Sequence, residues 1–193
     1  FCEHKRFAAF RRKRFPNYFD HFLKTFSHNQ KIELKIFTNV PFQKYANSGI
    51  NPSIRFYNMS LKECFKLCKT KLGISGFEFK DFRSYKLCDF KPMYGNIFAE
   101  YLEDCEYWGY CDPDMIVGNL DLYLDSTGLS NYDLITGTSQ VVGYMTLFRN
   151  NKMMNNLAKN SPDYLRIINS PKNHRFDECG KENIVALEQL LSR

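Results

Sequence analysis

Segments with the character of a β-strand alternate along this chain with segments that have the periodicity of an amphipathic helix. The strand-like segments span residues 32–38, 54–57, 107–111, 134–136 and 144–148. The helical segments span residues 16–28, 60–72, 91–102, 152–159, 163–168 and 182–191. This alternation predicts an α/β fold with a mixed, mostly parallel sheet flanked by helices. Ligands in such sheets bind beyond the carboxyl ends of the strands, so residues that directly follow a strand are candidates for function.

Two of the predicted helices carry recognisable signals at their ends. Ser60 and Glu63 have the spacing of a capping box, and Gly73 is placed to end the same helix. Asp89 is placed to cap a second helix, with Pro92 in its first turn, where a missing backbone N–H is tolerated. We therefore expect Asp89 to lie at the start of a helix.

The composition predicts one folded domain over residues 1–193. Apolar residues make up 44% of the chain and aromatic residues 16%, which is ample for a continuous core. The longest mostly apolar stretch, residues 141–148, is far shorter than the ~20 residues that cross a bilayer. The seven cysteines lack the paired spacing of zinc ribbons and secreted scaffolds, so we expect reduced thiols and a cytoplasmic protein.

Positive charge is concentrated at the beginning of the chain. The formal net charge is +6, and six lysines and arginines lie within residues 1–14. This basic N-terminal segment is either a solvated arm or a surface that faces phosphate. It would also suit peripheral contact with an anionic membrane surface.

The pattern that most directly indicates chemistry is Asp112-Pro113-Asp114, which follows the predicted strand 107–111. In an extended segment, side chains at i and i+2 point to the same side, so the two carboxylates can hold one divalent ion. Carboxylate oxygens suit Mg²⁺ or Mn²⁺, which keep coordination positions for water and substrate phosphates. The alternative is a solvated turn, since Asp and Pro are also typical turn residues.

The surroundings of this triplet resemble a known family. Residues 85–95 and 108–118, with matches at 15–19, 36–39 and 143–150, are similar to GT-A-fold nucleotide-sugar glycosyltransferases, especially small polysaccharide-type members of bacteria and large viruses. The resemblance implies a GT-A-like, Rossmann-related fold in which Asp112 and Asp114 bind the metal and the donor diphosphate. It further implies that Asn39 meets the base or ribose of the donor. The remaining donor-binding residues that it implies are Lys86, Asp89 and Lys91.

A second group of candidate residues lies downstream, in the run His174-Arg175-Phe176-Asp177-Glu178. The resemblance implies an acceptor-activating carboxylate or a further metal ligand here, so Asp177 and Glu178 are candidate general bases and His174 a candidate ligand. A carboxylate within hydrogen-bond reach of the acceptor hydroxyl can take its proton as the glycosidic bond forms. The alternative is that both acids belong to a loop before the last helix.

Together these residues predict a metal-dependent glycosyltransferase with Mn²⁺ or Mg²⁺ as cofactor. The donor would be a nucleotide-diphosphate sugar, a UDP-sugar by the resemblance, and the acceptor a saccharide or other glycan. The chain departs from the family at its start, where residues 1–11 make a poor central strand. Either these residues form the first strand despite their charges, or that strand is truncated or rearranged.

Two other functions fit parts of the sequence. Paired aspartates also bind metal in phosphoesterases and nucleases, although those sites usually have more acidic or histidine ligands. The basic N-terminal segment would suit a nonenzymatic nucleic-acid-binding module, together with the interleaved aromatic residues Phe7, Phe10, Phe15, Tyr18 and Phe19. These aromatic residues fit a buried helix face equally well, so we expect no nucleic acid as partner.

Overall fold

The computed structural model describes residues 14–46, 52–128, 131–138, 141–178, 180 and 184–191. The chain divides into two compact units. Unit 1 is formed by Phe1–Cys64 with Pro113–Asn131, and unit 2 by Phe65–Asp112 with Tyr132–Arg193. Residues 1–13 lie outside the described residues, and with them lie the predictions for the basic N-terminal segment and the first strand.

Unit 1 contains a small parallel sheet. Its strands are β1 (Leu34–Thr38) and β2 (Ile54–Asn58), paired in register from Leu34 opposite Ile54 to Thr38 opposite Asn58. The helices of unit 1 are α1 (Phe19–Phe26), α2 (Gln43–Ala46) and α6 (Leu120–Thr127). Helix α1 lies in the predicted helical segment 16–28 and buries Phe19, Phe22, Leu23 and Phe26, whereas Tyr18 precedes the helix and is exposed. Asn29 is fully buried and holds the start of α6, since its Oδ1 accepts a hydrogen bond of 2.6 Å from the Leu120 N–H.

Helix α3 (Leu61–Leu72) begins in unit 1 and continues into unit 2. The predicted capping box is confirmed. The Ser60 N–H donates to Glu63 Oε2 at 2.7 Å, and the Glu63 N–H donates to Ser60 Oγ at 3.2 Å. The helix ends before Gly73, whose φ of +70° is the left-handed conformation that a glycine adopts without strain.

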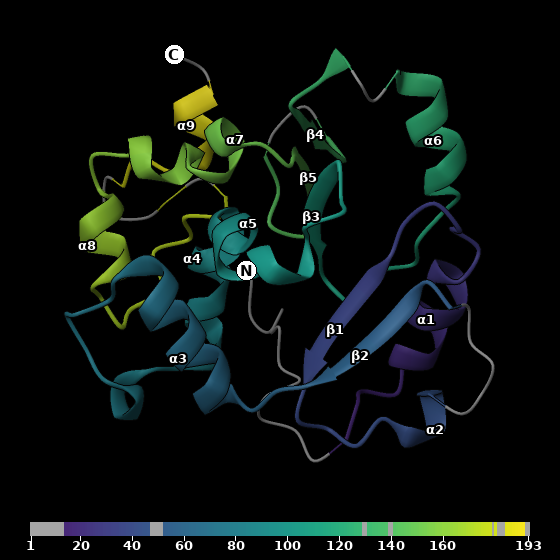
Figure 1. Ribbon diagram of the computed structural model, residues 1–193, viewed down its shortest axis with the longest axis horizontal. Coiled ribbons are helices and arrows are strands. Elements are labelled where there is room, and N and C mark those ends of the chain that lie inside the picture. Colours follow the sequence, from purple (N-terminus) through teal and green to yellow (C-terminus); the bar gives the residue numbers. More distant parts are fainter. Residues whose placement is uncertain are drawn as a thin grey trace. The chain divides into compact units, whose positions relative to one another are not determined.

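Unit 2 contains an antiparallel sheet. Its strands are β3 (Tyr107–Cys111), β4 (Leu134–Thr136) and β5 (Met145–Arg149), in the order β3-β5-β4 (Figure 1). The prediction of a mostly parallel sheet is therefore wrong: among the described residues one strand pair is parallel and two are antiparallel. The physical reason is the connection of β4 to β5 by residues 137–144, which is shorter than the crossover that parallel neighbours need.

A chain of short helical turns replaces the long helix predicted over residues 91–102. The turns are η3 (Ser84–Lys86), α4 (Leu87–Phe90), η4 (Lys91–Met93), α5 (Tyr94–Ile97) and η5 (Ala99–Tyr101). The prediction that Asp89 caps a helix is wrong, because Asp89 lies inside α4 and is fully buried. Its carboxylate accepts hydrogen bonds from a distant segment of backbone, described below, and is not used for capping.

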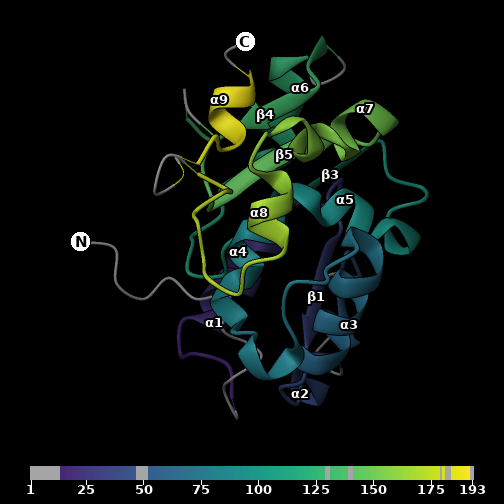
Figure 2. The same ribbon diagram turned by 90° about the vertical axis from the view of Figure 1, so that its left-hand side faces the viewer.

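The remaining helices of unit 2 are η2 (Phe79–Asp81), α7 (Lys152–Asn155), η7 (Leu157–Asn160), α8 (Tyr164–Ile168) and α9 (Leu187–Leu191). The predicted helical segments 152–159, 163–168 and 182–191 are confirmed as helical, in pieces that are shorter than predicted, whereas η2 was not predicted. Residues 182 and 183, at the start of the predicted last helix, lie outside the described residues. Helix α5 packs against β3, and α7 against β5 (Figure 2). Trp108 and Phe148 stack in the core of this unit with ring centroids 4.4 Å apart.

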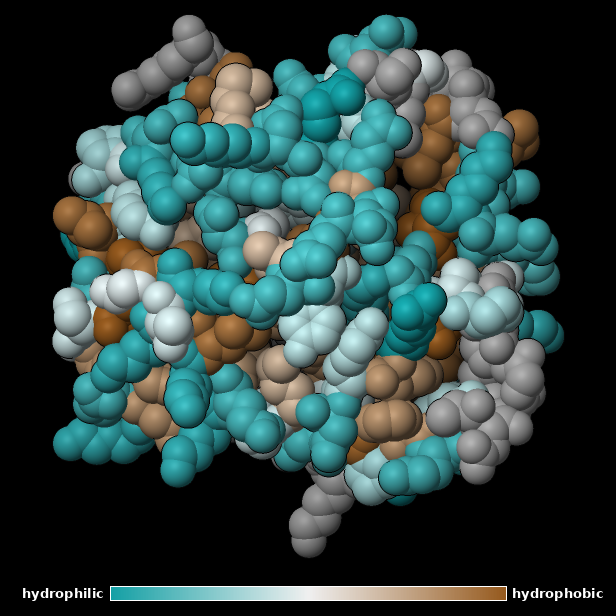
Figure 3. All heavy atoms as spheres, viewed as in Figure 1, coloured by the Kyte–Doolittle hydropathy of each residue, from teal (hydrophilic) through white to brown (hydrophobic). Residues whose placement is uncertain are grey.

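Most of the face shown in Figure 3 is hydrophilic, with hydrophobic patches between the polar side chains. None of the helices within the described ranges is long and apolar enough to span a membrane. Five of the seven cysteines are described, and these five form no disulfide with one another. Three of them, Cys64, Cys68 and Cys88, are buried.

Candidate functional site

Asp112 lies at the carboxyl end of β3, where the sequence predicts a ligand site. Its backbone N–H donates a hydrogen bond of 2.9 Å to the Tyr144 carbonyl, which continues the pairing of β3 with β5 past the end of both strands. The sheet therefore fixes the backbone of Asp112, while 13% of its side chain stays exposed. The predicted position of this acid directly after a strand is confirmed.

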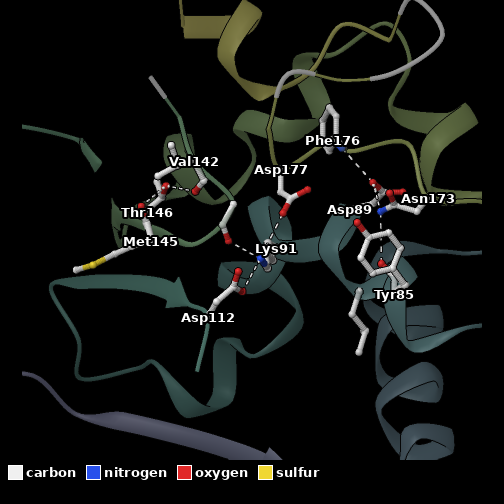
Figure 4. A network of polar contacts seen from close by, with 12 residues as sticks. Tyr85, Asp89, Lys91, Asp112, Val142, Met145, Thr146, Asn173, Phe176 and Asp177 are labelled. Atoms are coloured by element: carbon white, nitrogen blue, oxygen red, sulfur yellow. Dashed lines mark hydrogen bonds and ion pairs between the residues drawn. The ribbon is translucent and has the colours of Figure 1, made fainter. Parts of the chain in front are cut away.

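Lys91 joins Asp112 to a second carboxylate (Figure 4). The Lys91 Nζ lies 3.0 Å from Asp112 Oδ1 and 3.4 Å from Asp177 Oδ2, and it also donates to the Gly143 carbonyl. Only 3% of the Lys91 side chain is exposed. Three segments that are far apart in the sequence thus meet at the Lys91 ammonium group. Two of them contain the candidate site residues Asp112 and Asp177, and the third, with Gly143, belongs to the region of the resemblance.

Gly143 gives the acidic side chains their space. A Cβ atom at this position would lie 2.6 Å from Asp177 Oδ2 and 2.8 Å from Glu178 Oε1, closer than real Cβ atoms approach other atoms. Both acids therefore pack against the backbone of Gly143, and only glycine permits this approach. We call Lys91, Asp112, Gly143, Asp177 and Glu178 the Lys91 cluster.

Burial and charge shift the protonation of the cluster. Burial raises the pKa of the Asp177 carboxyl to about 7, although Lys91 acts in the opposite direction. Burial alone would lower the pKa of Lys91, but Asp177 and Asp112 outweigh it and raise that pKa above its ordinary value. At neutral pH Lys91 is therefore a permanent cation, and Asp177 is poised between its two protonation states.

The neighbouring thiols are poor nucleophiles. Burial raises the pKa of Cys88 and of Cys111 to about 12. A cysteine attacks as its thiolate, which is scarce so far below the pKa. The arrangement therefore suits chemistry by carboxylates and a cation, and it disfavours a covalent route through sulfur.

Lys86 and Asp89 form a separate ion pair beside the Lys91 cluster. Their charged atoms are 2.8 Å apart, and neither side chain is exposed at all. Lys86 Nζ also donates to two backbone carbonyls, those of Ile167 and Lys172, each at 2.8 Å.

The Asp89 carboxylate accepts hydrogen bonds from the segment that precedes Asp177 (Figure 4). The donors are the backbone N–H groups of His174 and Phe176, at 2.8 Å and 3.0 Å, and the Asn173 side chain at 3.0 Å. The buried pair therefore fixes the backbone that carries the catalytic candidates. Hydrogen bonds to a buried carboxylate compensate the cost of removing it from water.

The other predicted site residues are not part of the Lys91 cluster. His174 is buried, and its backbone is held by Asp89. Asn39 directly follows β1 and is exposed, as is Asp114, and both belong to unit 1. Within the described residues, no three His, Cys, Asp or Glu side chains form a group that could hold a metal.

The chemistry of Asp112 nevertheless fits a hard divalent cation. Mg²⁺ and Mn²⁺ are commonly bound by one or two carboxylates, with water and substrate phosphates completing the shell. With Asp177 ionised, the Lys91 cluster contains three carboxylates and one ammonium, a formal charge of 1 − 3 = −2. A partly exposed carboxylate in a net negative cluster attracts a cation that arrives with a phosphate ligand.

Sequence reasoning missed the role of Gly143. It lies within the region 143–150 that carries the resemblance, but a lone glycine before a strand has many uses. Its proximity to two acids more than thirty positions further along the chain is visible only in the folded protein.

A comparison with models of protein families matches residues 13–191 to a family of unknown function, DUF6625. The chain belongs to the DUF6625 family. The match contains every residue of the Lys91 cluster, so the cluster lies within the region that defines a DUF6625 protein. Searches of the curated proteins and of the solved structures find no match.

Proposed function

We propose that this protein is a glycosyltransferase of GT-A type, which transfers a sugar from a nucleotide-diphosphate donor to a hydroxyl of a saccharide acceptor. The donor that we propose is a UDP-sugar. The observation that carries the proposal is the ammonium of Lys91, which joins Asp112 to Asp177. The resemblance assigns Asp112 to the donor side and Asp177 to the acceptor side. Both would be needed within a short distance of the transferred sugar.

On the donor side, Asp112 and, two residues further along the chain, Asp114 would bind Mn²⁺ or Mg²⁺, with His174 as a further predicted ligand. The cation would neutralise negative charge on the departing nucleotide diphosphate. Asn39 stays the predicted contact to the base or ribose. The support from geometry on this side is the fixed, partly exposed position of Asp112 at the end of β3.

On the acceptor side, Asp177 would act as the general base. Its pKa of about 7 is suited to taking a proton at neutral pH, because a base works best when its pKa is near the working pH. Glu178 is the alternative base, since both carboxylates pack against Gly143. A base beside the acceptor hydroxyl is what an inverting transfer requires.

Lys86 and Asp89 would hold the backbone of the site in place without contacting the donor. The resemblance implies direct contact with the donor for both, but their side chains are fully buried and bind each other. We assign them to positioning, because their hydrogen bonds hold the segment that leads to Asp177. The free thiols are compatible with the cytoplasmic location that we infer for the protein.

The test is calorimetric titration of the protein with UDP, GDP and UMP, first with Mn²⁺ and then with chelator. We expect one diphosphate to bind in the presence of Mn²⁺ and to lose affinity with chelator. Asp112→Asn should remove this binding, while the matched control Asp104→Asn, at an exposed acid of unit 2, should keep it. Absence of binding to all three nucleotides by folded protein would contradict the proposal, and hydrolysis of a generic phosphodiester would then favour a phosphoesterase.

A further inference from the structure

Asp112 already has a cation beside it. The ammonium of Lys91 lies 3.0 Å from its Oδ1, and the pair is largely buried, with 3% of the lysine side chain and 13% of the aspartate side chain exposed. A buried ion pair is much less screened by solvent than a surface pair. Any divalent ion that binds to Asp112 must therefore compete with this ammonium for the carboxylate.

Lys91 can give up Asp112 without becoming an isolated buried charge. Its Nζ has a second carboxylate at 3.4 Å, Asp177 Oδ2, and it donates to the Gly143 carbonyl. The face of the Tyr110 ring lies 5.4 Å from the same nitrogen and adds a weak attraction. Loss of one partner would therefore leave the ammonium with others, at a moderate cost.

We propose that Lys91 is the resident counter-cation of this site, which Asp112 exchanges for the divalent cation of the donor. After the exchange Lys91 keeps its ion pair with Asp177. Binding of the donor would therefore strengthen the interaction of the Lys91 ammonium with the acceptor-side carboxylate. Lys91 is thus a positioning residue, which acts through two carboxylates. The inference rests on the proposed function only in assigning the cation to the donor.

The inference is tested by titrating the protein with Mn²⁺ alone, without nucleotide, and following binding by calorimetry. Lys91→Met removes the competing charge, so we expect Mn²⁺ affinity to rise at least about tenfold over that of the unmodified protein. The matched control is Lys71→Met, which removes one positive charge from a surface ion pair with Glu100 in the same unit. Its Mn²⁺ affinity should equal that of the unmodified protein, because surface charges are screened.

The carboxylate that gains the metal is identified by the double variant Lys91→Met with Asp112→Asn. We expect it to lose the gain in Mn²⁺ affinity, since the ligand itself is removed. A folded Lys91→Met protein whose Mn²⁺ affinity is unchanged would overturn the inference. A double variant that retains the full gain would overturn it too, because the metal would then bind elsewhere.

A second variant tests the same competition in the opposite direction. Asp177→Asn removes one carboxylate beside Lys91 and keeps Asp112, so we expect Lys91 to hold Asp112 more tightly and Mn²⁺ to bind several-fold more weakly. This variant decides the matter if Lys91→Met does not fold. Unchanged or tighter binding of Mn²⁺ by Asp177→Asn would contradict the exchange.

These outcomes are separate from the fate of the proposed function. Tighter binding of Mn²⁺ by Lys91→Met, without nucleotide binding by any variant, would support the role of Lys91 and contradict the transferase. Metal-dependent binding of UDP, together with an unchanged Mn²⁺ affinity in Lys91→Met, would support the transferase and overturn the role of Lys91.

Discussion

Lys86 and Asp89 form an ion pair of 2.8 Å whose two side chains are completely shielded from solvent. The pair connects the helical turns over residues 84–90 to the segment that carries Asp177, because each partner also hydrogen-bonds to backbone groups more than eighty positions away. The position of the candidate base therefore depends on two charges that never contact solvent.

The first prediction concerns this ion pair. Asp89→Asn should lower the free energy of unfolding by about 3–5 kcal/mol, because it leaves the ammonium of Lys86 buried without its countercharge. Urea unfolding followed by circular dichroism measures the change. Asp104→Asn, at an exposed acid, should change the same quantity by less than about 0.5 kcal/mol. A folded Asp89→Asn protein as stable as the unmodified one would show that the pair does not hold this segment.

The second prediction concerns Gly143. Gly143→Ala introduces a Cβ that would lie 2.6 Å from Asp177 Oδ2, so the acids must move away from their present positions. We expect kcat to fall about a hundredfold, because a displacement on the order of 1 Å is enough for such a loss. Gly137→Ala is the matched control, since its Cβ would meet Tyr144 at an ordinary 3.6 Å. Equal kcat values in both variants would contradict the role of Gly143.

The third prediction separates the two candidate bases. Asp177→Asn should reduce kcat by about 10²–10⁴-fold, the usual contribution of a general base, with a much smaller change in KM for the donor. Glu178→Gln should reduce kcat far less, because Asp177 is the acid bound to Lys91. Steady-state kinetics with the nucleotide sugar identified by titration measures both. The reverse order of effects would assign the base to Glu178.

The fourth prediction follows from the raised pKa of Asp177, which lies at about 7 in the folded protein against an ordinary value of 3.8. Between these values the folded state binds more protons than the unfolded state. The free energy of unfolding should therefore fall as the pH rises from about 4 through 7, while the fraction of active base increases. Urea unfolding at pH 5 and pH 8 should show a smaller decline for Asp177→Asn than for the unmodified protein. If the free energy of unfolding depended on pH identically in the two proteins, the pKa of Asp177 would not be raised.

Local physics made much of the fold predictable. The five strands of the described residues lie within two residues of their predicted bounds, because apolar and β-branched residues are typical of extended segments that pack in a sheet. The capping box of Ser60 and Glu63 was equally predictable, since its partners are three residues apart. The position of Asp112 after β3 follows from the same local pattern.

The helical stretch that begins near Asp89 was not predictable in this way. Its sequence has a cap-like acid, a proline and an apolar stripe, and yet it folds as a series of short turns. The carboxylate of Asp89 accepts hydrogen bonds from backbone N–H groups 85 and 87 positions away, and no local sequence pattern indicates these partners. Tertiary hydrogen bonds outweighed the local helix signal.

The sequence by itself thus determined the strands, the start of α3 and the acids worth examining. The tertiary structure decided how the strands pair, and it alone brought Lys91 between Asp112 and Asp177. The physical reason is that local conformation depends on neighbours within a few residues. The pKa and the partners of a buried charge depend instead on segments that meet only when the chain is folded.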